Sequence, residues 1–216
     1  MGHVVRDTDW CVIDINTATG FVFFQQRWMY NWVTAAGQSA WTLTERRNFH
    51  NRCDRAIWAA WSNRARLAVA GTSAFARRFR STPVSINLDI RWVTSRPHWN
   101  VTVTKIAAGA FRVSEVFWTD RRISLDSEDF KAVQKCDNTG AQCRSQVPVA
   151  HEFGHAAGNT AVLARGDEYR ATSTHVADYD SALNIGTTVR SRHFTTILDE
   201  MNAMVPDTTF SVHSVR

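Results

Sequence analysis

Two histidines stand four residues apart in the segment Val149–Gly158, whose sequence is Val-Ala-His-Glu-Phe-Gly-His-Ala-Ala-Gly. Residues at this spacing share one face of a helix, so a helix would turn His151 and His155 toward one point. Glu152 lies one position round, where its carboxylate can reach a water at that point. Two neutral imidazoles, a third protein ligand and one open position describe a catalytic zinc site. The alternative interpretation is a helix with two incidental surface histidines.

The chain has 216 residues, which is enough for one domain or for two small lobes about a cleft. Its 44% hydrophobic and 21% charged residues are ordinary for a globular protein. Most of its nine tryptophans are expected in the core or in a cleft wall. We expect a single domain, 1–216, in which 1–158 supplies a sheet, a backing helix and the motif helix. The remainder, 159–216, is expected to form a smaller C-terminal subdomain with the third ligand and the floor of the site.

The formal net charge of +5 comes mainly from arginine, since Lys105, Lys131 and Lys135 are the only lysines. Such a charge favours anionic partners, for example nucleic acid or a bacterial envelope. The arginines are scattered rather than clustered, so we interpret them as a solvated basic surface and expect no nucleic-acid partner.

The start of the chain, Met1–Arg6, lacks the apolar run of a secretory signal, and no segment has the length of a membrane span. We therefore expect a protein made in the cytoplasm without a signal peptide and without a membrane span. Delivery outside the cell or into a target cell by a signal-independent route, or removal of a leader, are the alternatives.

The four cysteines form no Cys-x-x-Cys zinc pattern. Cys136 and Cys143 flank a turn-rich loop that a disulfide would close in an oxidising compartment. Cys11 falls in an apolar strand and Cys53 on an apolar helical face, and both are expected to be buried thiols.

In the first third of the chain, strands are expected at Trp10–Ile15 and Phe21–Phe24, while Gln25–Trp41 matches no single pattern. Thr44 is the expected N-cap of one long helix from Glu45 to about Ala70, ended by Gly71. We interpret the arginines on its outer face as a solvated surface, with nucleic-acid binding as the alternative; they are Arg46, Arg47, Arg52, Arg55, Arg64 and Arg66.

Further strands are predicted where apolar residues alternate, at Val84–Val93 and His98–Ile106, joined by a turn at Ser95–Pro97. Phe111–Trp118 and Arg122–Asp126 add a strand and an edge. Pro148 is tolerated in the first turn of the motif helix. The sequence thus predicts the α+β class, with a mixed twisted sheet, a long backing helix, an active-site helix and a smaller C-terminal helical part.

This order of elements resembles that of the zincin metallopeptidases, and the resemblance implies a zincin-like fold. In that group an edge strand binds extended substrate along the cleft by main-chain hydrogen bonds. The resemblance covers roughly Val147–Met204, and the first 140 residues match only in the order of their elements.

The stretch after the motif is similar to the metzincin pattern, in which a glycine turn, here at Gly158, returns the third ligand to the zinc. The position expected for that ligand is Ala161, which has no donor atom. Asp167-Glu168-Tyr169 resembles the run that follows the glycine in several bacterial metallopeptidases, and its spacing is close to that of the aspzincins. Both resemblances imply Asp167 as the third ligand.

Several alternatives for the third ligand stay open. Glu168 is adjacent to Asp167, a glutamate near Glu200 would match a gluzincin, and His193 is a further candidate. Asp167 would then be a cap or turn residue without metal contact.

Downstream, Asp180–Gly186 resembles the Met-turn that floors the metzincin site, with Leu183 at the methionine position. His193 is a candidate hydrogen-bond donor to an oxyanion, or a surface histidine. Tyr169 is the other candidate donor, or a structural residue of its turn. Four further histidines are expected to be structural or exposed: His50, His98, His175 and His213.

The resemblance implies a zinc-dependent peptidase that acts on a protein or peptide, with Zn²⁺ held by His151, His155 and Asp167 and with Glu152 as general base. A compact basic domain also fits a toxin or effector delivered by a bacterial secretion or injection apparatus. The alternatives are a non-enzymatic zinc-stabilised module of a phage-like or secretion particle, and a nucleic-acid binder. The intact Glu152 argues against a purely structural zinc site, which needs no base.

Overall fold

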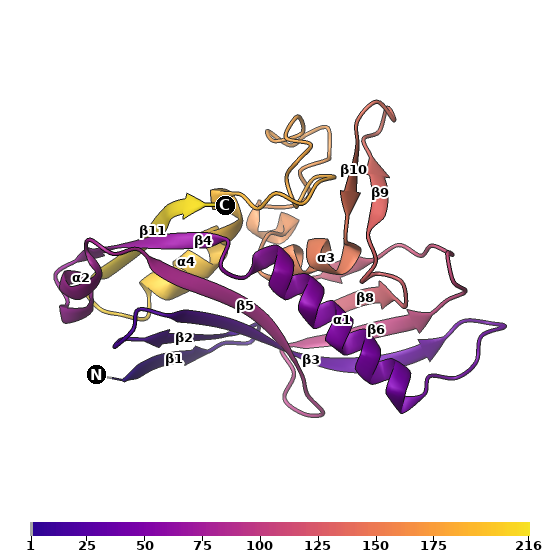
Figure 1. Ribbon diagram of the computed structural model, residues 1–216, viewed down its shortest axis with the longest axis horizontal. Helices are drawn as coiled ribbons and strands as arrows, with labels where there is room; N and C mark the ends of the chain where they lie inside the picture. Colours follow the sequence, from indigo (N-terminus) through magenta and orange to yellow (C-terminus); the bar gives the residue numbers. More distant parts are fainter. Residues whose placement is uncertain (1) are drawn as a thin grey trace.

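The computed structural model describes residues 2–216, which form an α+β structure around a mixed, nine-stranded sheet (Figure 1). The expected class and the mixed sheet are confirmed. The strand order is β11-β4-β5-β3-β6-β8-β7, and β1 and β2 continue the sheet beside β3. The strands are β1 His3–Asp7, β2 Val12–Asn16, β3 Val22–Thr34, β4 Ala65–Gly71, β5 Val84–Trp92, β6 Trp99–Lys105, β7 Glu115–Phe117, β8 Arg122–Asp126 and β11 Thr208–Val215.

The central strand, β3, holds the two halves of the sheet together. Its first half, Val22–Trp28, pairs in parallel with β5, and its second half, Trp28–Thr34, pairs in parallel with β6 on the other side. Buried and half-buried side chains alternate from Val22 to Met29, as the pleat requires. Most of the segment that matched no single sequence pattern, Gln25–Trp41, therefore belongs to β3, which continues to Thr34.

Helix α1, Leu43–Trp61, lies diagonally across one face of the sheet against β5 (Figure 1). Its N-cap is Thr42, not the expected Thr44. The Thr42 hydroxyl accepts a hydrogen bond from the Glu45 backbone N–H, and the Glu45 carboxylate accepts one from the Thr42 N–H, which completes a capping box.

The expected end of this helix near Ala70 is wrong, because the chain leaves the helix at Ser62 and Asn63 has a positive φ of 56°. From Ala65 onward, buried and outward side chains alternate, which suits a strand rather than a helix. This segment is β4, which pairs antiparallel with both β5 and β11. The Ser62 hydroxyl donates to the Leu88 carbonyl over 2.6 Å and thereby fixes the end of α1 on β5.

The C-terminal part was expected to be helical, but it also contains a strand. After the short helix η2, Ser191–Phe194, and α4, Thr195–Asn202, the chain returns to the sheet as β11. The period-two pattern of Phe210 and Val212 is interrupted by a bulge, which weakens it as a sequence signal for a strand.

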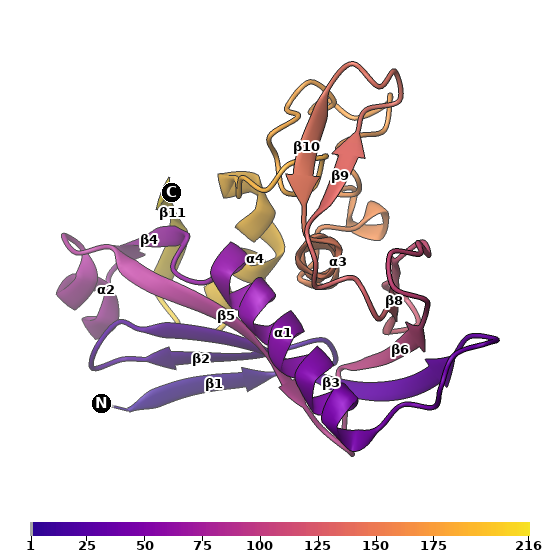
Figure 2. The same cartoon turned by 45° about the vertical axis from the view of Figure 1, so that its right-hand side comes forward.

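The remaining helices flank the sheet. The motif helix α3, Pro148–Ala156, packs beside α1 and near β7 and β8, and α2, Ala74–Phe79, contacts β4 and β11 (Figure 2). Strands β9, Val133–Cys136, and β10, Cys143–Gln146, form a separate hairpin that stands away from the main sheet.

One hydrophobic core contains residues from both 1–158 and 159–216. Six of the nine tryptophans are buried in it, as expected: Trp10, Trp28, Trp41, Trp61, Trp99 and Trp118. Cys11 and Cys53 are buried free thiols, also as expected. Within residues 2–216, no helix is both long enough and apolar enough to cross a membrane.

Candidate metal centre

The motif helix α3 begins with Pro148 in its first turn, and every residue from Val149 to Ala156 is buried. Three hydrogen bonds between the helix and other parts of the chain hold it in place. Trp61 at the end of α1 donates from its indole to the Ala150 carbonyl over 2.8 Å. The buried Gln26 side chain of β3 donates to the Ala156 carbonyl over 2.8 Å. The Val149 N–H donates to the Asp129 carbonyl over 3.0 Å, so both ends of the helix are held.

The helix ends at Ala156, two residues before Gly158, at which the sequence predicted the end of the helix. Gly158 has a φ of +103°, and a Cβ there would lie 2.4 Å from Thr196 atoms of α4. The Thr196 hydroxyl donates to the Gly158 carbonyl over 2.9 Å. The chain therefore turns sharply at this point and passes back over the metal-binding face of the helix.

The structure brings His151, His155 and Asp167 together into one group whose ligand atoms all lie within 4.8 Å of one another. The two Nε2 atoms are 3.2 Å apart, and Asp167 Oδ1 lies 2.8 Å from His155 Nε2 and 3.7 Å from His151 Nε2. Ala161, at the usual metzincin position, is exposed on the short helix η1, Ala161–Leu163. Asp167 thus occupies the third position of a group that could hold a metal ion.

Backbone carbonyls orient both imidazoles. His151 Nδ1 lies 2.8 Å from the Ala182 carbonyl oxygen, and His155 Nδ1 contacts the Asn159 carbonyl oxygen. These partners favour the tautomer in which each Nδ1–H donates and each Nε2 keeps a lone pair. Two lone pairs and a carboxylate oxygen that face one another create a site for a cation.

Burial and the charges of neighbouring groups shift the pKa values of these residues in different directions. Burial lowers the pKa of His151, which keeps its imidazole neutral. Burial opposes charge at His155 as well, but its hydrogen bond to Asp167 and the charge of Glu152 raise the pKa of His155. Burial alone would raise the pKa of Asp167, but the neighbouring imidazoles of His151 and His155 hold it well below its usual range.

Glu152 is only 8% exposed, and no hydrogen bond or ion pair joins its carboxylate to another residue in 2–216. A buried carboxylate without a direct partner is unusual in a structural role. Its negative charge acts on His151, His155 and Lys135. Glu152 therefore lies next to His151 and His155 with its carboxylate uncommitted to any other residue in 2–216.

Glu168 and His193, two rivals for the third ligand, point away from the metal centre. Glu168 accepts two hydrogen bonds of 2.7 Å from the Arg192 guanidinium, and His193 Nε2 lies 3.2 Å from Glu168 Oε1. His193 is 1% exposed, and its Nδ1 accepts from the Arg190 N–H over 3.1 Å. Both belong to a buried ionic network behind the site, and Asp178 extends it through Arg190 and Arg192.

Both ring nitrogens of His193, the candidate oxyanion donor, are engaged with residues of this network. The third rival, Glu200, forms an ion pair with Arg6 over 2.8 Å. Neither residue is brought to the metal centre.

The segment Ser181–Gly186, which we call the floor segment, is buried and packs against α3. Leu183 packs so closely that a Cβ on Gly154 would lie 2.7 Å from its Cδ2 atom. Gln146 fixes the segment, with its side-chain nitrogen 3.3, 3.1 and 2.9 Å from the carbonyl oxygens of Ala182, Asn184 and Gly186. Ala182 in turn orients His151.

Tyr169 lies at the centre, with its ring stacked on that of His151 at 6.2 Å between centroids. Its hydroxyl donates to Asp167, and burial together with this carboxylate raises the pKa of Tyr169. The Lys135 ammonium also lies over this ring, with its Nζ 4.4 Å from the ring centroid. No sequence pattern predicted a role for Lys135, because its position depends on the pairing of β9 with β10.

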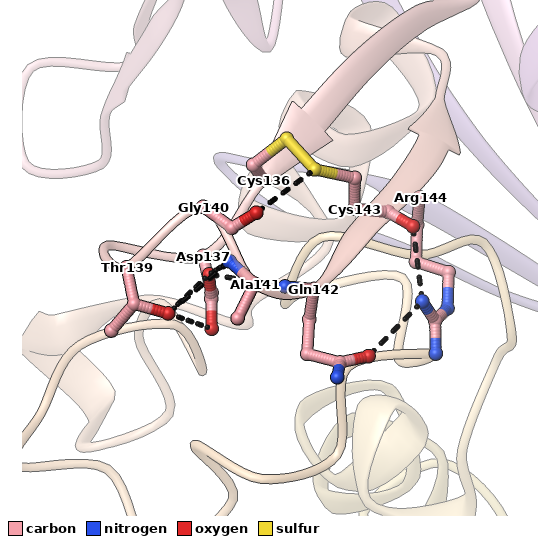
Figure 3. Close-up of a disulfide and its surroundings, with 8 residues drawn as sticks. All are labelled: Cys136, Asp137, Thr139, Gly140, Ala141, Gln142, Cys143 and Arg144. Atoms are coloured by element: carbon pink, nitrogen blue, oxygen red, sulfur yellow. Dashed lines mark hydrogen bonds between the residues drawn. A yellow bond between two sulfur atoms is a disulfide. The ribbon is translucent and has the colours of Figure 1, made fainter.

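The hairpin that carries Lys135 is closed by the Cys136–Cys143 disulfide, which the structure contains (Figure 3). In the loop between them, the Asp137 carboxylate accepts hydrogen bonds from Thr139, Ala141 and Gln142. Arg144 of β10 pairs with Asp180 over 2.6 Å, which joins the hairpin to the floor segment.

A cavity of about 420 Å³ adjoins His151. It lies between the end of α1, the outer side of α3 and Gly186–Val189, with alanines and Val147 among its apolar lining residues. Arg64 and Arg216 add cationic groups to its wall. Its position beside a candidate ligand residue gives the centre room for an apolar group of a bound molecule.

A scan against protein-family models and searches of curated proteins and of solved structures found no match to this chain.

Proposed function

We propose that this protein is a zinc-dependent metallopeptidase with a zincin-like fold. The observation that carries the proposal is the convergence of His151, His155 and Asp167 next to Glu152, a buried carboxylate with no direct partner in the described chain. A purely structural site would have no use for such a carboxylate and would fill its fourth position.

Zinc suits this donor set. It binds imidazole nitrogen and carboxylate oxygen at about 2.0–2.2 Å with tetrahedral angles, which places neighbouring ligand atoms about 3.3 Å apart. The three separations in the protein are 3.2, 2.8 and 3.7 Å, distributed around that value. The carbonyl partners of both Nδ1 atoms are the second-shell contacts that zinc-binding histidines usually have.

When bound, zinc would polarise the scissile carbonyl and make the attacking water more acidic. His151, His155 and Asp167 would hold it, and the Ala182 and Asn159 carbonyls would keep the imidazoles oriented. Glu152 takes the proton of the attacking water as general base and passes it to the leaving amine. The low exposure of the helix face around Glu152 limits competing water and strengthens these charge interactions.

Two further features support a peptide substrate. Strand β7 pairs only with β8 in the described sheet and lies near α3, so its other edge can pair with an extended chain. The cavity beside His151 can accept a side chain of that peptide. Together they supply backbone recognition and a side-chain pocket.

The disulfide supports a further part of the proposal, that the protein acts as a toxin or effector outside the reducing cytoplasm. Nucleic-acid binding by α1 has less support than the sequence suggested. Arg64 and Arg66 lie outside the helix, and the guanidiniums of Arg46 and Arg52 lie over the rings of Trp32 and Phe130.

The proposal is tested by measuring zinc content and peptide cleavage side by side. We expect about one zinc per chain in the wild type, none in His155→Ala and a weakened site in Asp167→Ala. Glu152→Gln should keep its zinc but lose about 10²–10⁴-fold in turnover of a cleaved peptide from a mixed library, because the base is gone.

Glu200→Gln is the matched control, because Glu200 pairs with Arg6 away from the centre. It should keep both zinc and turnover. A wild-type protein that takes up no zinc when the metal is supplied, or a fully active Glu152→Gln variant, would contradict the proposal.

A further inference from the structure

Lys135 is the one residue of β9 whose side chain turns inward. Its neighbours Val133, Gln134 and Cys136 are exposed, whereas Lys135 is half-buried. Its ammonium lies 4.4 Å from the centroid of the Tyr169 ring, and that ring stacks on His151. The lysine therefore lies beside the Tyr169 ring, next to the candidate metal centre.

The three lysines of the chain differ in their partners. Lys105 pairs with Glu45 over 2.7 Å, and Lys131 pairs with Glu128. Lys135 forms no ion pair within residues 2–216, although the charges of Glu152 and Asp167 act on it. Burial lowers the pKa of Lys135, which is the cost of removing an ammonium from water without a direct anionic partner.

The hairpin holds this cation in place. Lys135 pairs with Arg144 across the two strands, and the next pair toward the loop is the disulfide-bonded Cys136 and Cys143. At the other end of β10, Gln146 is bonded to the floor segment. A cation fixed in this way needs little reorganisation to meet a negative charge.

The other candidate groups are already engaged. His193 lies behind the site with Glu168, the Tyr169 hydroxyl donates to Asp167, and the exposed Arg170 pairs with Asp167 Oδ2 over 3.2 Å. Lys135 is the cation next to the Tyr169 ring that has no ion pair within the described chain.

We propose that Lys135 binds the anionic oxygen of a ligand at the metal centre, which in peptide hydrolysis is the oxyanion that forms from the scissile carbonyl. This inference rests on the proposed metal site. It assigns to a lysine on the disulfide-closed hairpin the binding of the oxyanion, for which the sequence analysis had named His193 and Tyr169 as candidates.

The test measures anion binding without relying on turnover. The full-length protein is loaded with Co²⁺, and inorganic phosphate, a tetrahedral anion, is titrated while the visible absorption of cobalt is followed. Imidazole serves as a neutral ligand for the same open position. We expect Lys135→Met to raise the Kd of phosphate at least about tenfold and to leave the Kd of imidazole unchanged.

Two further variants separate charge from folding. Lys135→Arg keeps a cation on a long stem and should retain phosphate binding within about threefold of the wild type. Lys131→Met removes an exposed lysine that lies four residues away and should change neither Kd.

An unchanged phosphate Kd in cobalt-loaded Lys135→Met would overturn the inference and leave the metal site intact. An equal loss of phosphate and imidazole binding would overturn it too, because the lysine would then act through the ligand geometry. A wild type that binds no cobalt would remove the metal site, and the inference with it. Selective loss of phosphate binding in a protein that cleaves no peptide would uphold the inference and contradict the peptidase.

Discussion

Gly154, in the middle of the motif, lies where α3 meets two other parts of the fold. A Cβ at this position would lie 2.7 Å from the Trp61 ring and 2.7 Å from Leu183 Cδ2. Trp61 closes the end of α1, and Leu183 belongs to the floor segment. The missing side chain thus allows the backing helix and the floor to approach the motif helix together.

We expect Gly154→Ala to lower the free energy of unfolding by about 1–3 kcal/mol, because the added methyl group overpacks a buried contact. Urea denaturation measures this difference. A double-mutant cycle with Leu183→Ala should show a coupling energy that differs from zero, since the two side chains compete for the same space. A Gly154→Ala variant as stable as the wild type would contradict so close an approach.

Single residues of the centre were predictable to different degrees. His151, Glu152 and His155 follow from helical spacing alone, which is a local property of the chain. Asp167 came from a resemblance, and its neighbour Glu168 could be assigned elsewhere only once Arg192 was seen beside it. His193 was misassigned because the sequence does not show which side of the floor segment it occupies.

At the scale of elements, the contact between α1 and β5 contains an unusual pair of carboxyl groups. Asp54 of α1 lies beside Asp89 of β5, which accepts a hydrogen bond of 2.9 Å from Gln25 of β3. Burial and the neighbouring Asp89 raise the pKa of Asp54 to about 7. The folded state therefore holds this proton more tightly than the unfolded chain, in which an aspartate has a pKa of about 3.9.

The stability contributed by protonated Asp54 is fully present below about pH 4 and is lost as the pH rises toward about 7. We expect Asp54→Asn to be more stable than the wild type by about 1–2 kcal/mol at pH 8, with the difference shrinking toward pH 5. Urea denaturation at the two pH values checks this. Asp120→Asn, at an exposed carboxylate, should show no such trend. A variant less stable than the wild type at pH 8 would argue against a strained carboxyl pair.

The boundaries of elements were harder to predict than their existence. The apolar positions Phe49, Cys53, Ile57 and Trp61 correctly predicted α1. Ala65 and Ala68 continued the same spacing, yet β4 occupies this segment because pairing with β5 and β11 buries Ala65, Leu67 and Val69. A partner nearly 150 residues away in the sequence decides the conformation here, and no local pattern contains that information.

At the scale of the whole molecule, the candidate metal centre joins two parts of the chain. His151 and His155 belong to α3, whereas Asp167 lies beyond the glycine turn in 159–216. A metal ion bound only by the folded protein would therefore stabilise the packing of both parts. At a concentration of about 100 times its Kd, zinc should raise the free energy of unfolding by about 2.7 kcal/mol.

This linkage is measured by thermal or urea unfolding with added zinc and with a chelator. Asp167→Ala should reduce the zinc-dependent gain, whereas Glu200→Gln should leave it unchanged. Equal stability with zinc and with chelator in the wild type would be evidence against an ion that bridges the two parts.

The pairing of β4 with β11 sets the order in which the molecule can be completed. Thr208 pairs with Gly71 and Val215 with Ala65, so the outer edge of β4 has no strand to pair with until β11 has been synthesised. Throughout synthesis this edge is open to other chains, and its exposed arginine, Arg66, is the only charged residue along β4 to discourage them. Translation that stops before β11 leaves a nascent chain that already carries every residue of the metal centre but remains prone to aggregate.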